Sequence, residues 1–477
     1  MAIAEETPLL TGTYIHTSHT QVYDRFTSGE KRLILTLVSC CALIPAFIHG
    51  ALIPSIPQVS YDLSTTPEVT SLTISTSHIG TALGSMFMAT YSRYYGRRPI
   101  YLVGLPFFCL GSYQMAKARS IYQFVAWNFV QNVGISGGIS LGAGTIGDIF
   151  KLEDRGFAMG LFYGASLLGL AIAPVIGGFA THYTSWRTIH WASFIYGLIV
   201  LILIALRLPE TSHPGTLGVE KADNQEQHAQ ADGVSRQRQK RRWVWLNPFS
   251  CLGLLRSPNL MLVALADTSV LLMDFVLSVP LRNTIGAKYG ITNEALIGAI
   301  LIPCGVGNTV GALLAGYISD RIIITYRAKR GGEWYPEDRL RGTLFSAATL
   351  VPLAVLFTGL TVEYVPGRTG LLLCLVWLFM NGVGIRLVLS PSEAYNVDVV
   401  HARSSEIIAA STATRTLLVS ILVPGILPSI DHFGIVVTNM AAALIVWAGL
   451  GLLMVTIRYG KQLRSWMDVG FSTVEDN

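Results

Sequence analysis

The stretch LFMNGVGIRLVLSPSEAYNVD, residues 378–398, places an arginine deep inside an apolar segment. The run that leads into it, GLLLCLVWLFM from Gly370, carries no charge and can begin a membrane-spanning helix, which needs ~20 mainly apolar residues. A charge at the bilayer centre costs at least ~2.5–3.5 kcal/mol on insertion scales. Arg386 therefore needs either a buried partner or a function.

The whole chain has the composition of a polytopic membrane protein. Of its 477 residues, 51% are hydrophobic and only 13% are charged, whereas soluble domains carry about 25% charged residues. We expect twelve spanning helices and no cleaved signal peptide. Pro54 and Pro57 are expected to interrupt the end of the first span. The six cysteines show no disulfide or zinc spacing, which predicts small packing residues.

Polar segments divide the apolar runs into two groups of six. Basic residues gather in alternate connections, which predicts that both termini and the central loop are cytoplasmic. The central loop contains the run RQRQKRR at 236–242, interpreted as a solvated linker, with contact to anionic lipid as the alternative. The predicted organisation is a cytoplasmic N-terminal tail 1–32, a six-helix half 33–208, a cytoplasmic loop 209–258, a second six-helix half 259–457 and a cytoplasmic tail 458–477.

An internal repeat relates the two halves. FVQNVGIS (129–136) is similar to FMNGVGIR (379–386), and the same ungapped alignment places Asp148 opposite Asp398 and Ser136 opposite Arg386. Two parallel six-helix repeats around a site at the middle of the membrane are one organisation of secondary transporters. The sequence thus predicts an all-α membrane protein built from two such halves.

Several motifs resemble one transporter family. SRYYGRRP (92–99), GLAIAPVIGG (169–178), SWRTIHW (185–191) and AYNVDVVHARSSEIIAASTATR (394–415) are similar to the fungal twelve-span drug:proton antiporters of the major facilitator superfamily, in their quinidine-resistance and dityrosine-exporter branch. The resemblance covers residues from about 30 to 457. It implies alternating access driven by a proton gradient, without a cofactor.

The resemblance also implies residues that control the conformational change. The family has an aspartate where this chain has Arg93, so the clamp of the first half is altered, while Asp320 is present in the second. GLAIAPVIGG is expected to be the antiporter motif of span five, with a generic small-residue packing face as the alternative. The residues so assigned are Arg93, Gly96, Arg97, Arg98, Asp148, Arg155, Pro174, Gly177, Gly178, Asp320, Arg321 and Asp398.

Candidate site residues are the polar groups inside the predicted spans. The family usually has an arginine in span four, where this chain has Asn128. Arg386 has two interpretations: a salt bridge to Asp267 or Asp274, or a binding site for an anionic substrate, because a guanidinium suits carboxylates. The substrate-binding candidates are Arg386, Asn128, Gln131, Asn381 and Arg415. The proton-coupling candidates are Asp274, Asp267, His49 and His78.

These observations favour a proton-coupled exporter of a small organic acid or secondary metabolite, with an itaconate-like carboxylate as one example. A multidrug:proton antiporter for lipophilic or cationic drugs is the alternative, and nutrient symport or a transporter-like sensor is disfavoured. An enzyme is not expected, since the sequence has no P-loop, GxSxG or metal-ligand cluster. The expected partners are the lipid bilayer and a small molecule, without nucleic acid. We expect a monomer in the cell membrane, or in a vacuolar or endosomal membrane.

Overall fold

The computed structural model describes residues 25–150, 152–212, 217–219, 244–333, 335–400 and 403–467. The RQRQKRR run and the side chain of Arg155 lie outside this described part. Every regular element within it is helical.

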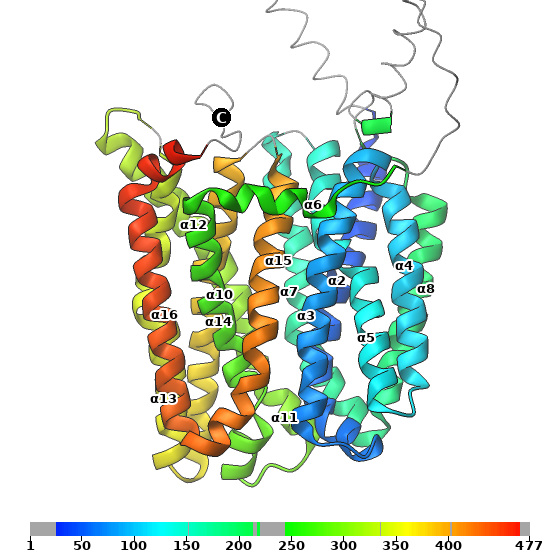
Figure 1. The fold of residues 1–477 in the computed structure, drawn as a ribbon, viewed down its shortest axis with the longest axis vertical. Helices are drawn as coiled ribbons and strands as arrows, with labels where there is room; N and C mark the ends of the chain where they lie inside the picture. The colour runs from blue at the N-terminus through cyan, green and yellow to red at the C-terminus, as the bar shows by residue number, and fades with distance from the viewer. Residues whose placement is uncertain are drawn as a thin grey trace, which may run out of the picture.

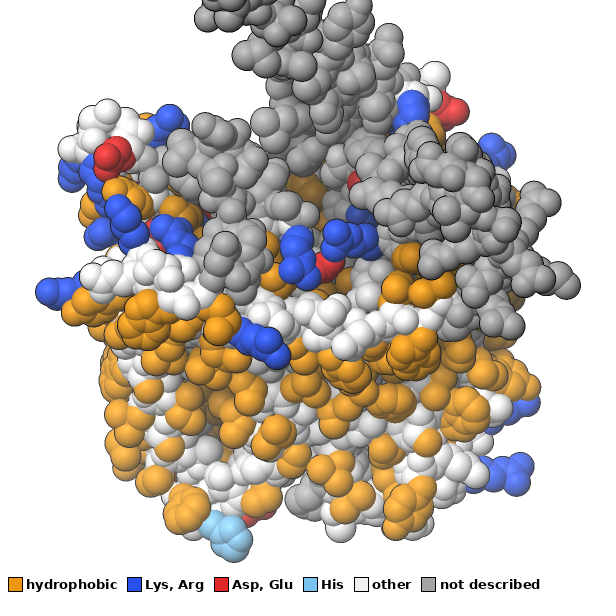
Figure 2. Space-filling model, turned by 45° about the horizontal axis from the view of Figure 1, so that its top comes forward, with side chains coloured by type: hydrophobic (Ala, Val, Ile, Leu, Met, Phe, Trp, Pro, Cys, Tyr) orange, Lys and Arg blue, Asp and Glu red, His pale blue; other side chains and the backbone are white. Residues whose placement is uncertain are grey.

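The first part of the chain folds into helices that run back and forth along one long bundle (Figure 1). They are α2 (Ser28–Asp62), α3 (Pro67–Tyr95), α4 (Arg97–Ala116), α5 (Ile121–Ile135), α6 (Gly137–Ile149), α7 (Leu152–Tyr183) and α8 (Trp186–Arg207). We call the end where α2 begins and α8 finishes the basic end, because Arg and Lys side chains gather around it (Figure 2). The other is the opposite end.

The second part continues the same pattern. A 3-10 segment, η1 (Pro248–Arg256), lies at the basic end and leads into α10 (Pro258–Ser278). The helices that follow are η2 (Arg282–Gly286), α11 (Glu294–Ile300), α12 (Ile302–Lys329), η3 (Pro336–Thr343), η4 (Ser346–Leu350), α13 (Val351–Tyr364), α14 (Gly367–Val399), α15 (Ser404–Leu422), η6 (Val423–Gly425) and α16 (Ile426–Trp466).

The flanks of the bundle are apolar enough to face lipid. Eight helical stretches in the described residues have the length and hydropathy to cross a membrane. Figure 2 shows hydrophobic side chains covering the flank below the charged rim. The chain is therefore an integral membrane protein.

The first helix differs from the prediction at its end. Pro54 and Pro57 were expected to interrupt it, but α2 continues through both, and through Pro45, to Asp62. Membrane helices tolerate proline where neighbouring helices and side chains satisfy the freed backbone groups. Here α2 packs along α7, its most extensive helix partner. The prolines therefore lie inside a supported helix.

The repeat is not exact in its local structure. In the first part, α5 and α6 are separated at Ser136. In the second part, α14 runs without a break from Gly367 to Val399, with Arg386 in its interior. Ser136 thus lies at a break between two helices. Arg386, which the repeat aligns with it, lies inside one continuous helix.

Candidate functional site

Arg386 lies in the middle of α14 and is partly exposed. Its Nε donates a hydrogen bond to Asn308 Oδ1 at 3.2 Å. Within the described residues, its two terminal nitrogens make no hydrogen bond and no ion pair within 4 Å. The salt bridge to Asp267 or Asp274, one of the two interpretations of Arg386, is therefore not formed here, although Asp274 lies within electrostatic range. The guanidinium keeps most of its donors available.

A chain of polar groups holds Arg386 in place. Asn308 Nδ2 donates to the carbonyl of Cys304, 3.1 Å away and one turn earlier on α12. The Cys304 thiol donates to Asp274 Oδ1 on α10 at 3.3 Å. The six cysteines were expected to be packing residues, and all are free thiols. Cys304 does more than fill space, because it connects the carboxylate of α10 to the network around Arg386.

Two groups near Arg386 escaped the site prediction. Tyr163 of α7 is partly exposed and lies within electrostatic range of Arg386 and Glu393. Glu393 lies two turns after Arg386 on α14, which places both side chains on one helical face. A lone tyrosine in an apolar segment gives little signal in a sequence. Glu393 follows the apolar run by several polar residues, and α14 extends beyond it to Val399.

A second arginine, Arg415, shares Glu393 with the surroundings of Arg386. Arg415 of α15 places Nη2 3.2 Å from Glu393 Oε1 and Nη1 4.0 Å from Asp267 Oδ2. Asp267 is fully buried. The candidate Arg415 therefore has two acidic partners on α14 and α10, and the candidate Asp267 is matched by this arginine rather than by Arg386.

The two candidate histidines stack on each other. The rings of His49 on α2 and His78 on α3 are nearly parallel, with centroids 5.1 Å apart. The ring of Phe275 on α10 meets His78 edge-on at 4.9 Å. His49 Nδ1 lies 2.7 Å from the Pro45 carbonyl, which fixes its hydrogen on Nδ1. These three rings form a layer that joins α2 and α3 to α10, which we call the ring layer.

The remaining substrate-binding candidates are Asn128 and Gln131 on α5 and Asn381 on α14. Asn128 accepts a hydrogen bond from Ser77 Oγ at 2.7 Å, and Gln131 donates to Ser112 Oγ at 2.7 Å. Asn128, Gln131 and Asn381 are all fully buried. Asn128 borders a cavity of about 10 Å³, which has room for roughly one water molecule. In the described part of the chain, none of these residues forms a hydrogen bond or ion pair with Arg386.

Matching ion pairs occur in the two parts at the basic end. Arg97 Nε lies 3.2 Å from Asp148, and Arg339 Nε lies 2.7 Å from Asp398. These aspartates are the two that the repeat aligned. Arg339 also approaches Asp320 at 3.7 Å.

The turn before α4 gives structural roles to two further motif residues, Gly96 and Arg98. Gly96 has a φ of 103°, a conformation that a side chain would strain. The carboxylate of Glu210 accepts hydrogen bonds from the backbone N–H groups of Arg97 and Arg98 at 3.0 and 3.1 Å. Negative charge is favourable at a helix N-terminus. Gly96, Arg97 and Arg98 thus form the start of α4. The Arg98 side chain also donates a hydrogen bond to the Ala205 carbonyl.

Contacts between the two parts occur at both ends. At the basic end, Arg93 of α3 forms an ion pair with Glu406 of α15. Toward the opposite end, α7 and α11 touch through their backbones: a Cβ added at Gly178 would lie 2.4 Å from the Glu294 carbonyl oxygen. One at Gly298 would lie 2.1 Å from that of Pro174. The small residues of the span-five motif therefore form a close packing face.

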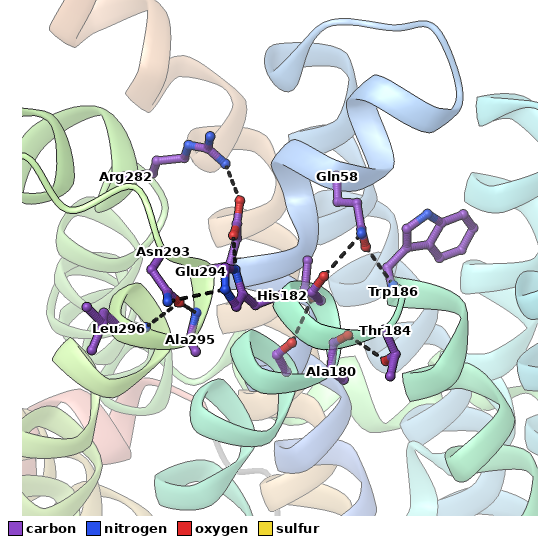
Figure 3. Close-up of polar contacts among 12 residues, drawn as sticks. Gln58, Ala180, His182, Thr184, Trp186, Arg282, Asn293, Glu294, Ala295 and Leu296 are labelled. Carbon is purple, nitrogen blue, oxygen red and sulfur yellow. Dashed lines mark hydrogen bonds and ion pairs between the residues drawn. The ribbon is translucent and has the colours of Figure 1, made fainter.

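Beyond that face, polar contacts join the same helices (Figure 3). His182 lies one turn after Gly178 on α7, and its Nδ1 is 3.1 Å from Glu294 Oε2. Arg282 Nη1 lies 3.2 Å from the other carboxylate oxygen of Glu294. This group was not predicted, because no sequence pattern indicates which residues of α7 and α11 meet.

An all-helical membrane bundle with charged side chains in its interior is typical of proteins that move ions or solutes across a membrane. Residues 38–424 match the Major Facilitator Superfamily. The chain belongs to this superfamily, whose members are transporters rather than enzymes. No group of three or more metal-ligating side chains is found in the part of the chain that the structure describes.

Fungal transporters are among the similar proteins. Efflux pump radE of Floropilus chiversii is 28% identical over 86% of this chain and 77% of its own length. MFS-type transporter oryF of Aspergillus oryzae is 27% identical over 91% of this chain and 90% of its own length. Citrate exporter 1 of Aspergillus niger is 28% identical over 62% of this chain and 58% of its own length. The resemblance to fungal exporters is thus confirmed.

Proposed function

We propose that this transporter exports a small organic acid in exchange for protons. The single observation that carries the cargo class is Arg386, a partly exposed guanidinium inside the bundle whose terminal nitrogens make no ion pair within 4 Å in the described residues. Arginine stays charged and presents a planar fork of donors that fits a carboxylate. That one relative is named a citrate exporter agrees with an acidic cargo.

The proposed arrangement is twelve spans in two halves, with the basic end in the cytoplasm. Four passes beyond the eight apolar stretches follow if α3, α4 and α5–α6 also cross and if α15 and α16 cross separately. The excess of basic residues at that end supports the orientation. The chain would act as a monomer in the cell membrane, or in a vacuolar or endosomal membrane.

The proposed cycle uses contacts between the halves at both ends. Breaking the Arg93–Glu406 pair would open the basic end and admit the acid to Arg386. Breaking the α7–α11 contacts would open the opposite end. Protons entering from that end would bind at Asp274, Asp267 or the histidines of the ring layer, change the charge around Arg386 and favour release.

Secretion by a host cell tests the proposal. Extracellular organic acids are measured by mass spectrometry in strains that lack the gene, overexpress it, or express Arg386→Ala. An acid that rises on overexpression and not with Arg386→Ala, at equal surface expression, is the expected result. The control is Arg368→Ala, which removes an exposed arginine at the start of α14.

A second candidate function is export of cationic drugs. Three carboxylates, those of Asp267, Asp274 and Glu393, lie in the interior beside two arginines. If secreted acids do not change in the same strains while resistance to lipophilic cations does, this candidate replaces the organic acid.

A further inference from the structure

A cavity of about 230 Å³ lies toward the opposite end of the bundle, away from Arg386. It is bounded by α2 and the start of α3 on one side and by α10, η2 and α11 on the other. It therefore lies between the two parts of the chain. Much of its wall is apolar, and includes Ile53, Pro57, Ile297 and Leu427.

Three polar side chains interrupt this apolar wall: Ser278, Arg282 and Asn283. Ser278 is 5% exposed, and its hydroxyl has no hydrogen-bond partner in the described part of the structure. Arg282 uses one of its five N–H donors on Glu294. A buried hydroxyl without a partner is costly, and a ligand in this cavity that carries a hydrogen-bonding group would satisfy it.

The ring layer lies one helical turn from this cavity, at the level of Asp274, which is within electrostatic range of Arg386. On α10, Asp274 and Phe275 are followed one turn later by Ser278. On α2, His49 is followed one turn later by Ile53. The cavity thus lies one helical turn beyond the stacked rings, on the line between the two parts of the chain. A solute that passed from Arg386 toward the opposite end would pass this cavity.

We infer that this cavity is a second anion-binding site, which holds the carboxylate cargo after it leaves Arg386 and before it leaves the protein. The inference rests on the proposed function for the identity of the cargo. A carboxylate would bind the guanidinium of Arg282, a hydroxyl or second carboxylate would bind Ser278, and the carbon skeleton would pack against Ile53 and Leu427. The chemical class is a small hydroxylated or dicarboxylic acid.

The neighbouring ion pair gives this site a consequence for gating. Glu294 is held by Arg282 on one oxygen and by His182 on the other. A cargo carboxylate competes with Glu294 for Arg282, because both are acceptors for the same fork. Its arrival therefore frees Glu294 from Arg282 of η2 and leaves His182 of α7 as the charged or polar side chain that holds this carboxylate, at the end through which the cargo leaves.

Protection of an introduced cysteine tests the site without any need for transport. The full-length protein carrying Asn283→Cys is purified in detergent and labelled with a hydrophilic maleimide. Succinate and citrate are expected to slow labelling severalfold, and neutral succinamide is not. Arg282→Gln in the same background should abolish this protection. Glu294→Gln, which breaks the same ion pair but keeps the cation, should retain it. Thr369→Cys, exposed at the same end, reports on non-specific effects.

The outcomes separate this inference from the proposed function. Equal labelling with and without both acids, protection that persists in Arg282→Gln, or the same slowing at Thr369→Cys would each overturn the second site. If secretion depends on Arg386 while no protection occurs, the proposed function stands and this inference fails. If protection depends on Arg282 while no acid is exported, the second anion-binding site stands and the proposed export of an organic acid fails.

Discussion

His182 and Glu294 join α7 to α11 through a hydrogen bond whose direction is set by a third residue (Figure 3). Asn293 Oδ1 caps α11 by accepting from the Ala295 N–H at 2.8 Å, so its Nδ2 is the group that faces His182 Nε2 at 3.3 Å. Nε2 must then accept, and Nδ1 carries the hydrogen that is donated to Glu294. A neutral imidazole satisfies both contacts.

Loss of this imidazole should open the opposite end more often. His182→Ala removes two hydrogen bonds between the parts, each with a net value of about 0.5–1.5 kcal/mol. A change of about 1.4 kcal/mol is tenfold in an equilibrium, so labelling of Ile297→Cys, in the cavity wall and 3% exposed, should accelerate severalfold. Thr184→Ala, which loses only a bond to the Ala180 carbonyl near the end of α7, is the control. An unchanged labelling rate with His182→Ala would contradict the prediction.

Arg415 should be needed for folding as much as for transport. Asp267 is fully buried, and Arg415 is its only ion-pair partner among the described residues. Removing one member of a buried pair costs about 3–5 kcal/mol, whereas removing both is often nearly neutral. Arg415→Ala should therefore lower the thermal unfolding temperature of the detergent-purified protein, and Arg415→Ala/Asp267→Ala should recover most of it. Equal stability of Arg415→Ala and the parent would show that the charge of Arg415 does not stabilise the buried Asp267.

Cys251 should resist thiol reagents in the folded protein. It lies in η1, where burial and the nearby charge of Glu406 raise the pKa of its thiol to about 11 from 9.0. At neutral pH this lowers the thiolate population about 100-fold, and the thiolate is the reactive form. Reactivity should increase as the pH rises toward that pKa. Mass spectrometry after maleimide treatment, in detergent and after unfolding in SDS, measures the difference. Labelling as fast as at Thr369→Cys would contradict it.

The fold could be predicted from the sequence because its signals are local and repeated. Apolar runs, basic connections and the motifs around Gly96 and Pro174 each depend on nearby residues, and together they indicate the superfamily. Helix ends were predicted less well. The first helix was expected to be interrupted from Pro54, yet it packs along α7 and continues to Asp62. Such support comes from a helix more than a hundred residues away.

The candidate site was predicted only in part, because it also depends on contacts between helices that are far apart in the sequence. Arg386 stands out as a charge in an apolar segment, and Asp267, Asp274 and the histidines stand out similarly. Their partners do not: the acceptor for Arg386 is Asn308 on α12, and Asp267 pairs with Arg415 rather than with Arg386. One sequence gives the polar residues of each helix but not the rotation of one helix against another.

Asn308 should act by positioning Arg386. Its Oδ1 accepts from Arg386 Nε at 3.2 Å, and the side chain is 3% exposed. A hydrogen bond to a charged group has a value of about 1.5–3 kcal/mol, so Asn308→Ala should raise the KM for the exported acid roughly tenfold or more, with a smaller change in kcat. Transport into inside-out vesicles over a range of acid concentrations separates these constants.

A carboxylate at this position distinguishes positioning from simple packing. Asn308→Asp has nearly the same volume, but it would form an ion pair with Arg386 and compete with the anionic cargo for the same donors. It should therefore impair transport more than Asn308→Ala, despite the smaller change in shape. Thr309→Ala, on the next position of α12 and bonded only to the Gly305 carbonyl of its own helix, should transport normally. Parent-like transport by Asn308→Asp would mean that the free donors of Arg386 do not bind the cargo.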